Sequence, residues 1–272
     1  MHPPDGDARF AGSIPQLYER CLVPLIFAPY AADLARRVAR RQPARVLELA
    51  AGTGVLTRHL ATTLPARVAI VATDLNQPML DHAAAIGTAR PVQWRQADAL
   101  HLPFPAAAFD VVVCQFGVMF FPDKARAFAE ARRVLRDHGQ FIFSVWDQIE
   151  HNVFAASVTE ALATVFPDDP PRFLARVAHG YHDPAVIAQD LARGGFTQSV
   201  QATTVPARSR AASPRIPAVG YCQGTPLRNE IEARDPSRLG EATDRAAEAI
   251  ARQFGAGVVD GKMQAHIIAI EC

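Results

Sequence analysis

The chain has 272 residues, 49% of them hydrophobic, and a formal net charge of +1 at pH 7. This length and hydrophobic content allow one large domain, or a domain with an insertion, to bury a full core. The near-zero charge argues against a basic nucleic-acid-binding surface, and no hydrophobic run approaches the roughly 18 residues of a membrane-spanning helix. The four cysteines form no CxxC motif. We therefore expect a cytoplasmic protein with free thiols, no bound metal and no stable membrane insertion.

Residues 15–41 have helical spacing, and Pro24 is the expected point of interruption, with Pro29 as a second candidate. From residue 44 onward, apolar segments alternate with amphipathic ones. The expected strands are 45–49, 67–74, 92–98, 109–116 and 140–146, and the expected helices between them are 54–64, 77–87 and 123–137. This alternation predicts an α/β fold whose parallel sheet carries helices on both faces. The carboxyl ends of the strands then share one edge, where such sheets bind ligands.

The pattern changes after Trp146. Residues 147–182 lack a strand pattern and contain three prolines, so we expect a helical insertion or lid. Beyond it the sequence predicts a helix over 183–195, a strand over 196–205, an irregular proline-rich stretch over 206–235, a helix over 236–255 and a last strand over 262–272.

A glycine turn joins the first strand to the first helix of the alternating region. Gly52 and Gly54 lie in this turn, and without a Cβ atom they let a ligand approach the backbone closely. The dinucleotide-binding fingerprint requires a third glycine or alanine, but Thr57 stands at that position. The turn therefore departs from the form found in NAD(P)-dependent oxidoreductases, which remain an alternative.

Three acidic residues follow successive strands: Glu48, Asp74 and Asp98. Asp74 comes twenty residues after Gly54, the spacing at which a carboxylate binds the hydroxyls of a ribose. Each acid alone could be a helix cap or a solvated side chain, but three at neighbouring strand ends form a negative pocket. Such a pocket disfavours a pyrophosphate and suits a ligand with a ribose, a base with an amine, and positive charge. S-adenosylmethionine has all three.

Four segments together resemble a known family: VLELAAGTG, VATDLNQPML, RQADALHLPFPAAAFDVVVCQFGVMFFPD and ARRVLRDHGQFIFSVWD. They are similar to class I S-adenosylmethionine-dependent methyltransferases, in the small-molecule branch of the ubiquinone and menaquinone methyltransferases. The resemblance is dense over 44–147 and looser beyond. Asp137, His138 and Gly139 replace the usual Pro-Gly-Gly before the fifth strand.

The resemblance implies a doubly wound, Rossmann-like, mostly parallel sheet of seven strands with an antiparallel last strand. It implies an N-terminal helical cap (1–43), a cofactor-binding core (44–147), a helical insertion or lid over the acceptor site (148–182), and a segment that completes the sheet (183–272).

The resemblance also implies roles for individual residues. Glu48 and the backbone at Gly52 and Gly54 would hold the methionine part of the cofactor, and Asp74 would bind the ribose. The remaining implied cofactor residues are Leu75, Asn76, Met79, Asp98, Ala99 and Gln115. Met79 would pack on the adenine, Asp98 would accept from its amine, and Gln115 would accept from the ammonium group.

The methyl acceptor is expected to be a small apolar or aromatic metabolite, because aromatic residues gather near the strand ends and in the helical segments. The candidate pocket residues are Tyr18, Tyr30, Phe116, Phe120, Trp146 and Tyr181. Methyl transfer is an in-line displacement that depends mainly on positioning, so a general base is optional. His182 is the first candidate for a base and His151 the second.

Several alternatives stay open at this level. Transfer to oxygen, nitrogen or carbon cannot be separated, and the chain could bind the cofactor without catalysis. A nucleic-acid methyltransferase is disfavoured, because CQFG replaces the expected Asn/Asp-Pro-Pro-aromatic tetrad after the fourth strand. A homodimer is compatible with the sequence but is not indicated by it.

Overall fold

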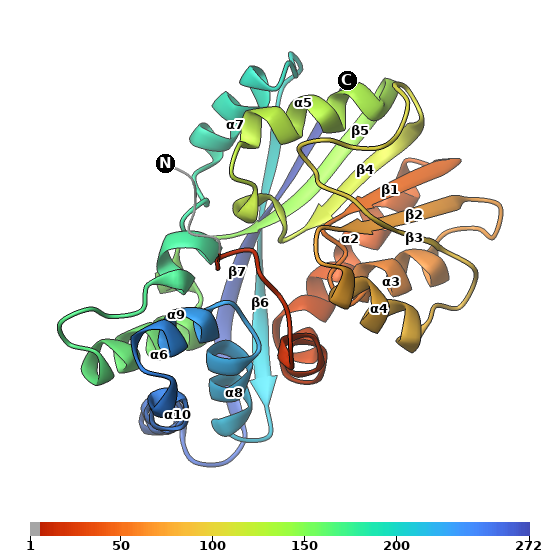
Figure 1. The fold of residues 1–272 in the computed structure, drawn as a ribbon. Coiled ribbons are helices and arrows are strands. Elements are labelled where there is room, and N and C mark those ends of the chain that lie inside the picture. The colour runs from red at the N-terminus through yellow and green to blue at the C-terminus, as the bar shows by residue number, and fades with distance from the viewer. Residues whose placement is uncertain (1–5) are drawn as a thin grey trace. The chain divides into compact units, whose positions relative to one another are not determined.

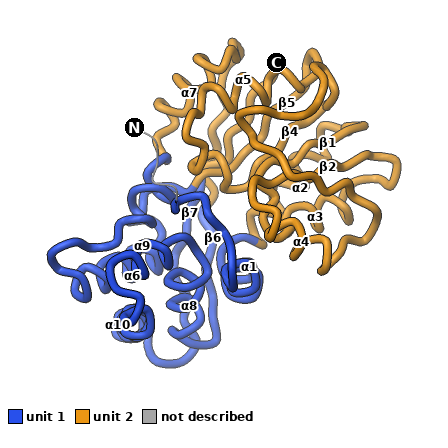
Figure 2. Tube along the Cα trace, viewed as in Figure 1, with its two compact units in different colours: residues 1–27, 146–181, 206–265 blue, residues 28–145, 182–205, 266–272 orange. Residues whose placement is uncertain are grey.

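The computed structural model describes residues 6–272, which form two compact units. Each unit is built from segments that are distant in sequence (Figure 2). Unit 1 comprises residues up to 27 together with 146–181 and 206–265, and unit 2 comprises 28–145, 182–205 and 266–272. Residues 1–5 of the expected N-terminal cap lie outside the described part. The division of the chain by functional role stays a prediction.

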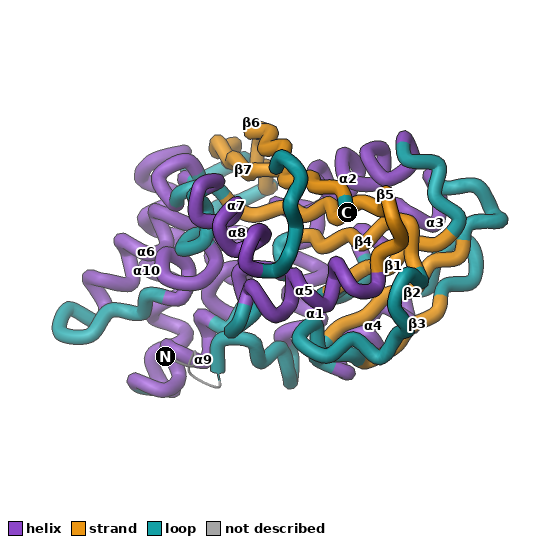
Figure 3. Tube along the Cα trace, turned by 90° about the horizontal axis from the view of Figure 1, so that it is seen from above, coloured by secondary structure: helices purple, strands orange, loops and turns teal. Residues whose placement is uncertain are grey.

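Seven strands form one sheet in the order β3-β2-β1-β4-β5-β7-β6. Their bounds are β1 (Arg45–Leu49), β2 (Ala69–Asp74), β3 (Gln93–Gln96), β4 (Phe109–Gln115), β5 (Leu135–Trp146), β6 (Gln201–Ala211) and β7 (Val259–Glu271). Strands β1 to β5 pair in parallel and lie side by side (Figure 3). The strand order reverses between β1 and β4, which is where doubly wound sheets bind ligands.

The last strand runs against the others. The backbone nitrogen of Cys272 donates to the backbone oxygen of Gly139, and the backbone nitrogen of Asp147 donates to the backbone oxygen of Gln264. One residue number rises as the other falls along this pairing, so β7 is antiparallel to β5. The predicted fold class, a mostly parallel seven-stranded sheet with an antiparallel last strand, is confirmed.

Helices of unit 2 cover both faces of its strands. Helices α3 (Val55–Thr63) and α4 (Gln77–Ile86) lie on one side, and α5 (Lys124–Val134) and α7 (Pro184–Arg193) lie on the other (Figure 1). Helix α2 (Ala28–Arg40) packs against α3. Residues 111–114 of β4 are completely buried between these layers. A strand covered on both faces must be apolar throughout, which explains the sequence VVVC.

Unit 1 is mainly helical. Its helices are α1 (Ile14–Leu17), the π-helix η1 (Tyr18–Phe27), α6 (Val153–Val165), α8 (Arg215–Gln223), α9 (Leu227–Arg234) and α10 (Leu239–Phe254). Short helical turns lie at η3 (Ile149–His151), η4 (Leu174–Ala178) and η5 (Pro236–Arg238). Helix α10 packs against both α6 and α8. The expected helical character of 147–182 agrees with η3, α6 and η4.

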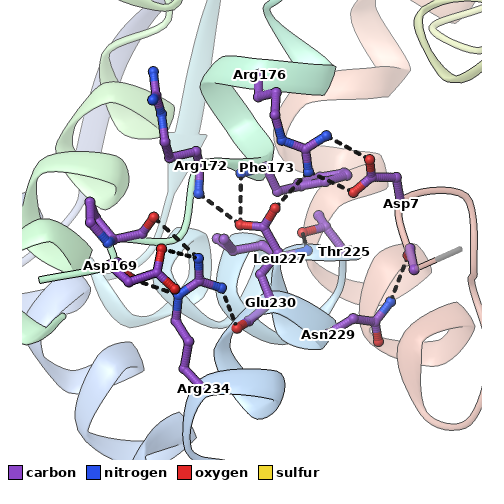
Figure 4. A network of polar contacts seen from close by, with 12 residues as sticks. Asp7, Asp169, Arg172, Phe173, Arg176, Thr225, Leu227, Asn229, Glu230 and Arg234 are labelled. Atoms are coloured by element: carbon purple, nitrogen blue, oxygen red, sulfur yellow. Dashed lines mark hydrogen bonds and ion pairs between the residues drawn. The ribbon is translucent and has the colours of Figure 1, made fainter. Parts of the chain in front are cut away.

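Polar contacts fix the N-terminal segment within unit 1. The guanidinium of Arg176 donates to both carboxylate oxygens of Asp7, at 2.7 and 2.8 Å, and to Glu230 at 2.7 Å (Figure 4). The side-chain nitrogen of Asn229 donates to the backbone oxygen of Gly6 at 2.9 Å. Two planar groups paired through two parallel bonds form a stronger contact than a single ion pair.

The prediction of a break at Pro24 was wrong. Residues 14–40 form a continuous helical run, and Pro24 lies inside η1. A π-helix shifts the hydrogen-bonding partner by one residue, so its wider turn accommodates the missing donor of proline. The buried side chains of Leu22, Leu25 and Ile26 hold this segment in the core.

Two other boundaries also differ from the sequence-based expectation. The helix predicted up to residue 137 ends at Val134, and β5 begins at Leu135, because Leu135 pairs with Phe109 of β4. The pairing is irregular beyond that point, and His138 has a positive φ of 61°. Pairing with a neighbouring strand has overridden helix propensity here.

The stretch 206–235, predicted to be irregular, contains the end of β6, all of α8 and all of α9. The prolines fit these elements. Pro206 lies in β6, an edge strand, where a backbone donor is dispensable. Pro214 and Pro226 immediately precede α8 and α9, at positions whose N–H groups need no helical partner. The predicted strand 196–205 begins later, at Gln201.

Candidate functional site

The candidate site lies at the carboxyl edge of β1 to β4, within unit 2. Glu48 is the fourth residue of β1, Asp74 ends β2, and Gln115 ends β4. Asp98 follows β3 by two residues. The backbone nitrogens of Ala51 and Ala97 donate to the backbone oxygens of Thr73 and Asp74, respectively. The loops after β1 and β3 are therefore both held to β2. Four of the predicted polar residues therefore share one sheet edge.

The glycine turn requires its glycines. Gly52 and Gly54 have positive φ values of 57° and 84°, a region that favours glycine. A Cβ atom on Gly54 would lie 3.0 Å from the ring of Trp94 and 3.1 Å from the Cβ of Ala83. Gly54 is also the N-cap of α3, so the free N–H groups of that helix open onto the turn.

Asp74 is a buried carboxylate that orders the surrounding backbone. Its side chain is part of a residue only 7% exposed, and it accepts from the backbone nitrogens of Gly52 and Asn76, each at 2.8 Å. Burial raises the pKa of this carboxyl, and the two backbone donors partly oppose the rise. Asp74 thus fixes the glycine turn while its remaining lone pairs can still accept from a ligand.

Glu48 is buried even more completely, at 1% exposure. Its Oε2 accepts from the hydroxyl of Thr57 at 2.6 Å. Burial raises the pKa of Glu48 from 4.5 to about 8, the Thr57 bond opposes this rise, and the charge of Asp74 adds to it. Two buried carboxyl groups at adjacent strand ends make this a site that favours a cationic ligand.

The backbone beside the acids is strained. Ala50 and Phe116, which follow β1 and β4, have positive φ values of 50° and 51°. A Cβ atom on Gly117 would lie only 2.4 Å from the Cβ of Ala50 and 2.6 Å from the Sγ of Cys114, so the two loops are in close contact. Strain of this kind in non-glycine residues is concentrated at functional sites.

Sequence reasoning missed two residues, Thr53 in the turn and Thr57 in the first turn of α3. Thr57 was noted only as a departure from the dinucleotide fingerprint, yet its hydroxyl holds Glu48. The hydroxyl of Thr53 is buried and has no hydrogen-bond partner within residues 6–272. A polar residue between two glycines of a strand–helix turn was the available signal for Thr53.

The other predicted cofactor residues differ in exposure. The side chain of Leu75 is 51% exposed, whereas Met79 is buried in α4. Asn76 immediately precedes α4. The Asp98 carboxylate is 45% exposed and accepts from the backbone nitrogen of Leu100 at 2.9 Å. Ala99 and Gln115 are both half-buried.

Three of the predicted acceptor-site residues lie in unit 2. Tyr30 is buried, its ring meets that of Phe116 edge to face at 5.3 Å, and its hydroxyl donates to the backbone oxygen of Val205. Phe120 is half-buried at the end of the 3-10 helix η2 (Val118–Phe120). His182, also half-buried, precedes Asp183, which caps α7.

The other predicted aromatic residues lie in unit 1. Trp146 contacts Phe27 at 5.9 Å between ring centres, and Phe27 stacks on Tyr18 at 4.8 Å. Trp146 also lies 6.0 Å from the ring of His179, which was not among the predicted site residues. Tyr181 is buried in the same unit. The rings of Tyr18 and Trp146 are thus linked through Phe27.

His151 has a carboxylate partner in unit 1. Its Nδ1 lies 2.9 Å from Oδ2 of Asp147, a residue only 6% exposed. The side-chain nitrogen of Gln264 donates to the same oxygen at 2.6 Å. A buried carboxylate that contacts Nδ1 orients the imidazole ring and fixes its tautomer.

Within residues 6–272, no group of three or more His, Cys, Asp or Glu side chains is arranged to hold a metal ion. The same residues include no helix long and apolar enough to span a membrane.

The polar groups of the site fit a cationic ligand that carries hydroxyl groups. Glu48 and Asp74 supply two buried carboxyl groups that a nearby cation would hold in the ionised form, the Thr53 hydroxyl, unpartnered within residues 6–272, supplies a further polar atom, and Gly54 keeps the turn clear of side chain. A phosphate would meet the two carboxyl groups at close range. These features match the groups of S-adenosylmethionine.

The chain is similar to known methyltransferases. The family described as a methyltransferase domain matches residues 47–143. Ubiquinone/menaquinone biosynthesis C-methyltransferase UbiE of Ralstonia pickettii (strain 12J) is 33% identical over 164 residues, which cover 56% of this chain and 67% of that protein. Malonyl-(acyl-carrier protein) O-methyltransferase of Geobacter sulfurreducens is 36% identical over 156 residues, which cover 57% of this chain and 56% of that protein. The chain therefore spans about half to two thirds of the length of these curated relatives.

A solved structure supports the fold. The YcgJ protein of Bacillus subtilis superposes with a TM-score of 0.56 at 19% sequence identity, over 89% of this chain and 98% of that chain. The family match, together with the UbiE relative, agrees with the resemblance carried by the four sequence segments. The chain belongs to the class I S-adenosylmethionine-dependent methyltransferases, in the branch similar to the ubiquinone and menaquinone methyltransferases.

Proposed function

We propose that this protein transfers a methyl group from S-adenosylmethionine to a small apolar or aromatic metabolite. The observation that carries the proposal is the pair of buried carboxyl groups, Glu48 and Asp74, beside a glycine turn that requires its glycines. When bound, the cofactor supplies an activated methyl group on a sulfonium. The protein then has to bind the donor, align the acceptor and exclude water.

The cofactor roles follow the chemistry of each side chain. Glu48 and the backbone of the glycine turn would hold the methionine part, and Thr53 would add a hydroxyl donor there. Asp74 would accept from the ribose hydroxyls while it keeps its bonds to Gly52 and Asn76. Leu75, Met79, Asp98 and Ala99 would surround the adenine, and Gln115 would accept from the ammonium group.

The acceptor class is the finer part of the proposal. The names of the two curated relatives describe C-methylation in quinone biosynthesis and O-methylation of a malonyl acyl-carrier protein. Within unit 2, the aromatic residues Tyr30, Phe116 and Phe120 favour an apolar or aromatic acceptor over a polar one, and Tyr18, Trp146 and Tyr181 of unit 1 stay predicted pocket residues. The cytoplasmic location and the homodimer stay predictions.

Among the base candidates, the carboxylate partner of His151 favours it over His182. An imidazole whose Nδ1 faces a buried carboxylate has its ring orientation and tautomer fixed, which positions its other nitrogen to accept a proton. A base is needed only if the acceptor binds with its proton in place.

Thermal unfolding with added ligands tests the cofactor. S-adenosylmethionine or its demethylated product at a hundred times its Kd should add about 2.7 kcal/mol to stability and raise Tm by roughly 5–10 °C, while NAD should not. Asp74→Asn should abolish most of this shift, because it removes the charge that favours the ribose hydroxyls. Asp81→Asn, on the exposed face of α4, is the matched control and should keep the shift.

The outcomes separate the alternatives. A shift with NAD but none with S-adenosylmethionine would overturn the proposal and favour an oxidoreductase. If S-adenosylmethionine binds but no demethylated cofactor forms with a panel of phenols, quinols and acyl thioesters, a binding protein without this activity is favoured.

A further inference from the structure

Glu48 lies in a setting where a negative charge is poorly compensated. The carboxyl group is fully buried, and its Oε2 accepts one hydrogen bond, from Thr57 of α3. The hydroxyl of Thr73 on β2 donates to the backbone oxygen of Glu48 and not to its side chain. Hydrogen bonds to a carboxylate make ionisation easier, and Glu48 has fewer of them than Asp74.

Three neighbouring elements bring titratable or charged groups to Glu48. Strand β2 contributes Asp74, a second buried carboxyl, and β4 contributes the Cys114 thiol. Helix α3 contributes Arg58, whose guanidinium donates to the backbone oxygen of Thr53 at 2.7 Å. The charge of Asp74 opposes ionisation of Glu48 and that of Arg58 favours it less strongly, so a proton on Glu48 relieves the repulsion between the two carboxyl groups.

Asp74 is the carboxyl better suited to stay ionised. It accepts from the backbone nitrogens of Gly52 and Asn76, and the backbone fixes the orientation of these two donors. The excess proton of the pair therefore belongs on Glu48. The direction agrees with the raised pKa of about 8 for Glu48, which leaves it mostly protonated at pH 7.

We infer that binding of S-adenosylmethionine drives a proton from Glu48 into the solvent, so that the site exchanges a proton for the ammonium group of the cofactor. The inference rests on the proposed function. The exchange conserves charge in the buried site: one positive charge leaves as a proton and another enters on the ligand. An ammonium group close to Glu48 favours the carboxylate form and lowers the pKa of that group.

The exchange makes cofactor affinity depend on pH in a defined direction. Below the pKa of free Glu48, each lower pH unit should weaken binding about tenfold, because a proton must first be displaced. Above pH 8 the dependence that arises from Glu48 should end, and affinity should fall again because the ligand amine loses its own proton with a pKa of about 8. At pH 7 binding should release most of one proton, because the raised pKa of Glu48 leaves that carboxyl mainly protonated in the free protein.

Isothermal titration calorimetry in buffers of different ionisation enthalpy measures the proton release directly. We expect the wild-type protein to release close to one proton per cofactor at pH 7. Glu48→Gln should release none, and between pH 6 and 7 its affinity should not show the tenfold loss per pH unit of the wild type, because the ligand amine is already mostly protonated there. If Glu48→Gln still releases a proton, the proton comes from the ligand amine and the inference is wrong.

A second variant keeps the test decisive if Glu48→Gln does not bind. Thr57→Val removes the hydrogen bond that favours the ionised form of Glu48, so the inflection in affinity should move to higher pH. Thr62→Val, on the exposed face of the same helix, is the control and should leave the inflection in place. An unchanged inflection in Thr57→Val would overturn the inference.

The same titration separates this inference from the proposed function. If the wild-type protein binds no S-adenosylmethionine at any pH between 6 and 9, the proposed function fails. If it binds the cofactor with the same affinity throughout that range and releases no proton, the proposed function stands and the proton exchange is refuted.

Discussion

At the scale of single residues, the hydrogen-bond partner of a side chain supplies information on its role that the sequence does not contain. His182 and His151 are both half-buried histidines in the chain beyond β5, but His151 faces the buried carboxylate of Asp147. Gln264 also donates to that carboxylate, and so holds it in place. The contact of His151 with a buried carboxylate therefore makes it the first candidate for a base, a rank that its sequence context did not indicate.

His151→Gln should lower kcat by about 100-fold or more if the acceptor loses its proton during transfer, because positioned bases contribute on that scale. Cofactor affinity should be unchanged. His182→Gln is the comparison and should leave kcat within a few-fold of the wild type. Steady-state kinetics with an acceptor of the proposed class decides between them, and the reverse ranking would return the role to His182.

The loops that follow β1 and β4 pack so closely that no space is left for a methyl group on Gly117. The loop after β4 approaches the loop after β1 so closely that a Cβ atom on Gly117 would lie 2.4 Å from the Cβ of Ala50. Both loops already carry a positive φ at a non-glycine residue, Ala50 and Phe116. Each loop therefore limits the conformations that the other can adopt.

Gly117→Ala should destabilise the protein by about 1–3 kcal/mol, because the new methyl group forces the two loops apart. Gly240→Ala is the matched control: it lies in α10 with no atom within 4 Å of the added Cβ. It should be neutral or stabilise by about 0.4–1 kcal/mol, because alanine lowers the entropy of the unfolded chain. Urea unfolding measures both, and equal stabilities would contradict the clash.

Across the whole molecule, residues far apart in sequence fold into the same unit. Unit 1 joins residues near the N-terminus to 146–181 and 206–265. Its polar network ties these three segments together, since Arg176 bonds both Asp7 and Glu230, and Arg234 donates to the backbone oxygen of Asp169 (Figure 4). The N-terminal segment is therefore held by residues that follow it by more than 160 positions.

Arg176→Leu should leave the buried Asp7 carboxylate without its bidentate partner. We expect a cost of about 1–3 kcal/mol, toward the lower end because the Arg176 side chain is 38% exposed. Hydrogen exchange read by mass spectrometry should accelerate in residues 6–13. Arg172→Leu, whose side chain is exposed, is the control, and equal exchange in both variants would show that the network does not hold the segment.

The order of elements from 44 to 134 and the class of the sheet could be predicted from the sequence, because burial on both faces makes the inner strands, such as β4, apolar, while the helices that cover them are amphipathic. The predictions that relied on prolines as helix breakers were wrong at two places, where tertiary packing determined the secondary structure. Pro24 did not break the helix, and the proline-rich stretch 206–235 formed two helices, because a proline disrupts only a position that needs its missing donor.

The sequence by itself determined that Glu48, Asp74 and Asp98 follow neighbouring strands and that the turn at Gly52 and Gly54 opens a helix, because both follow from local pattern and spacing. Only the tertiary structure decided which carboxyl is held by backbone donors, that Thr57 supports Glu48, and that Asp147 faces His151. Hydrogen bonds and burial arise between segments brought together by folding, and no local sequence pattern specifies them.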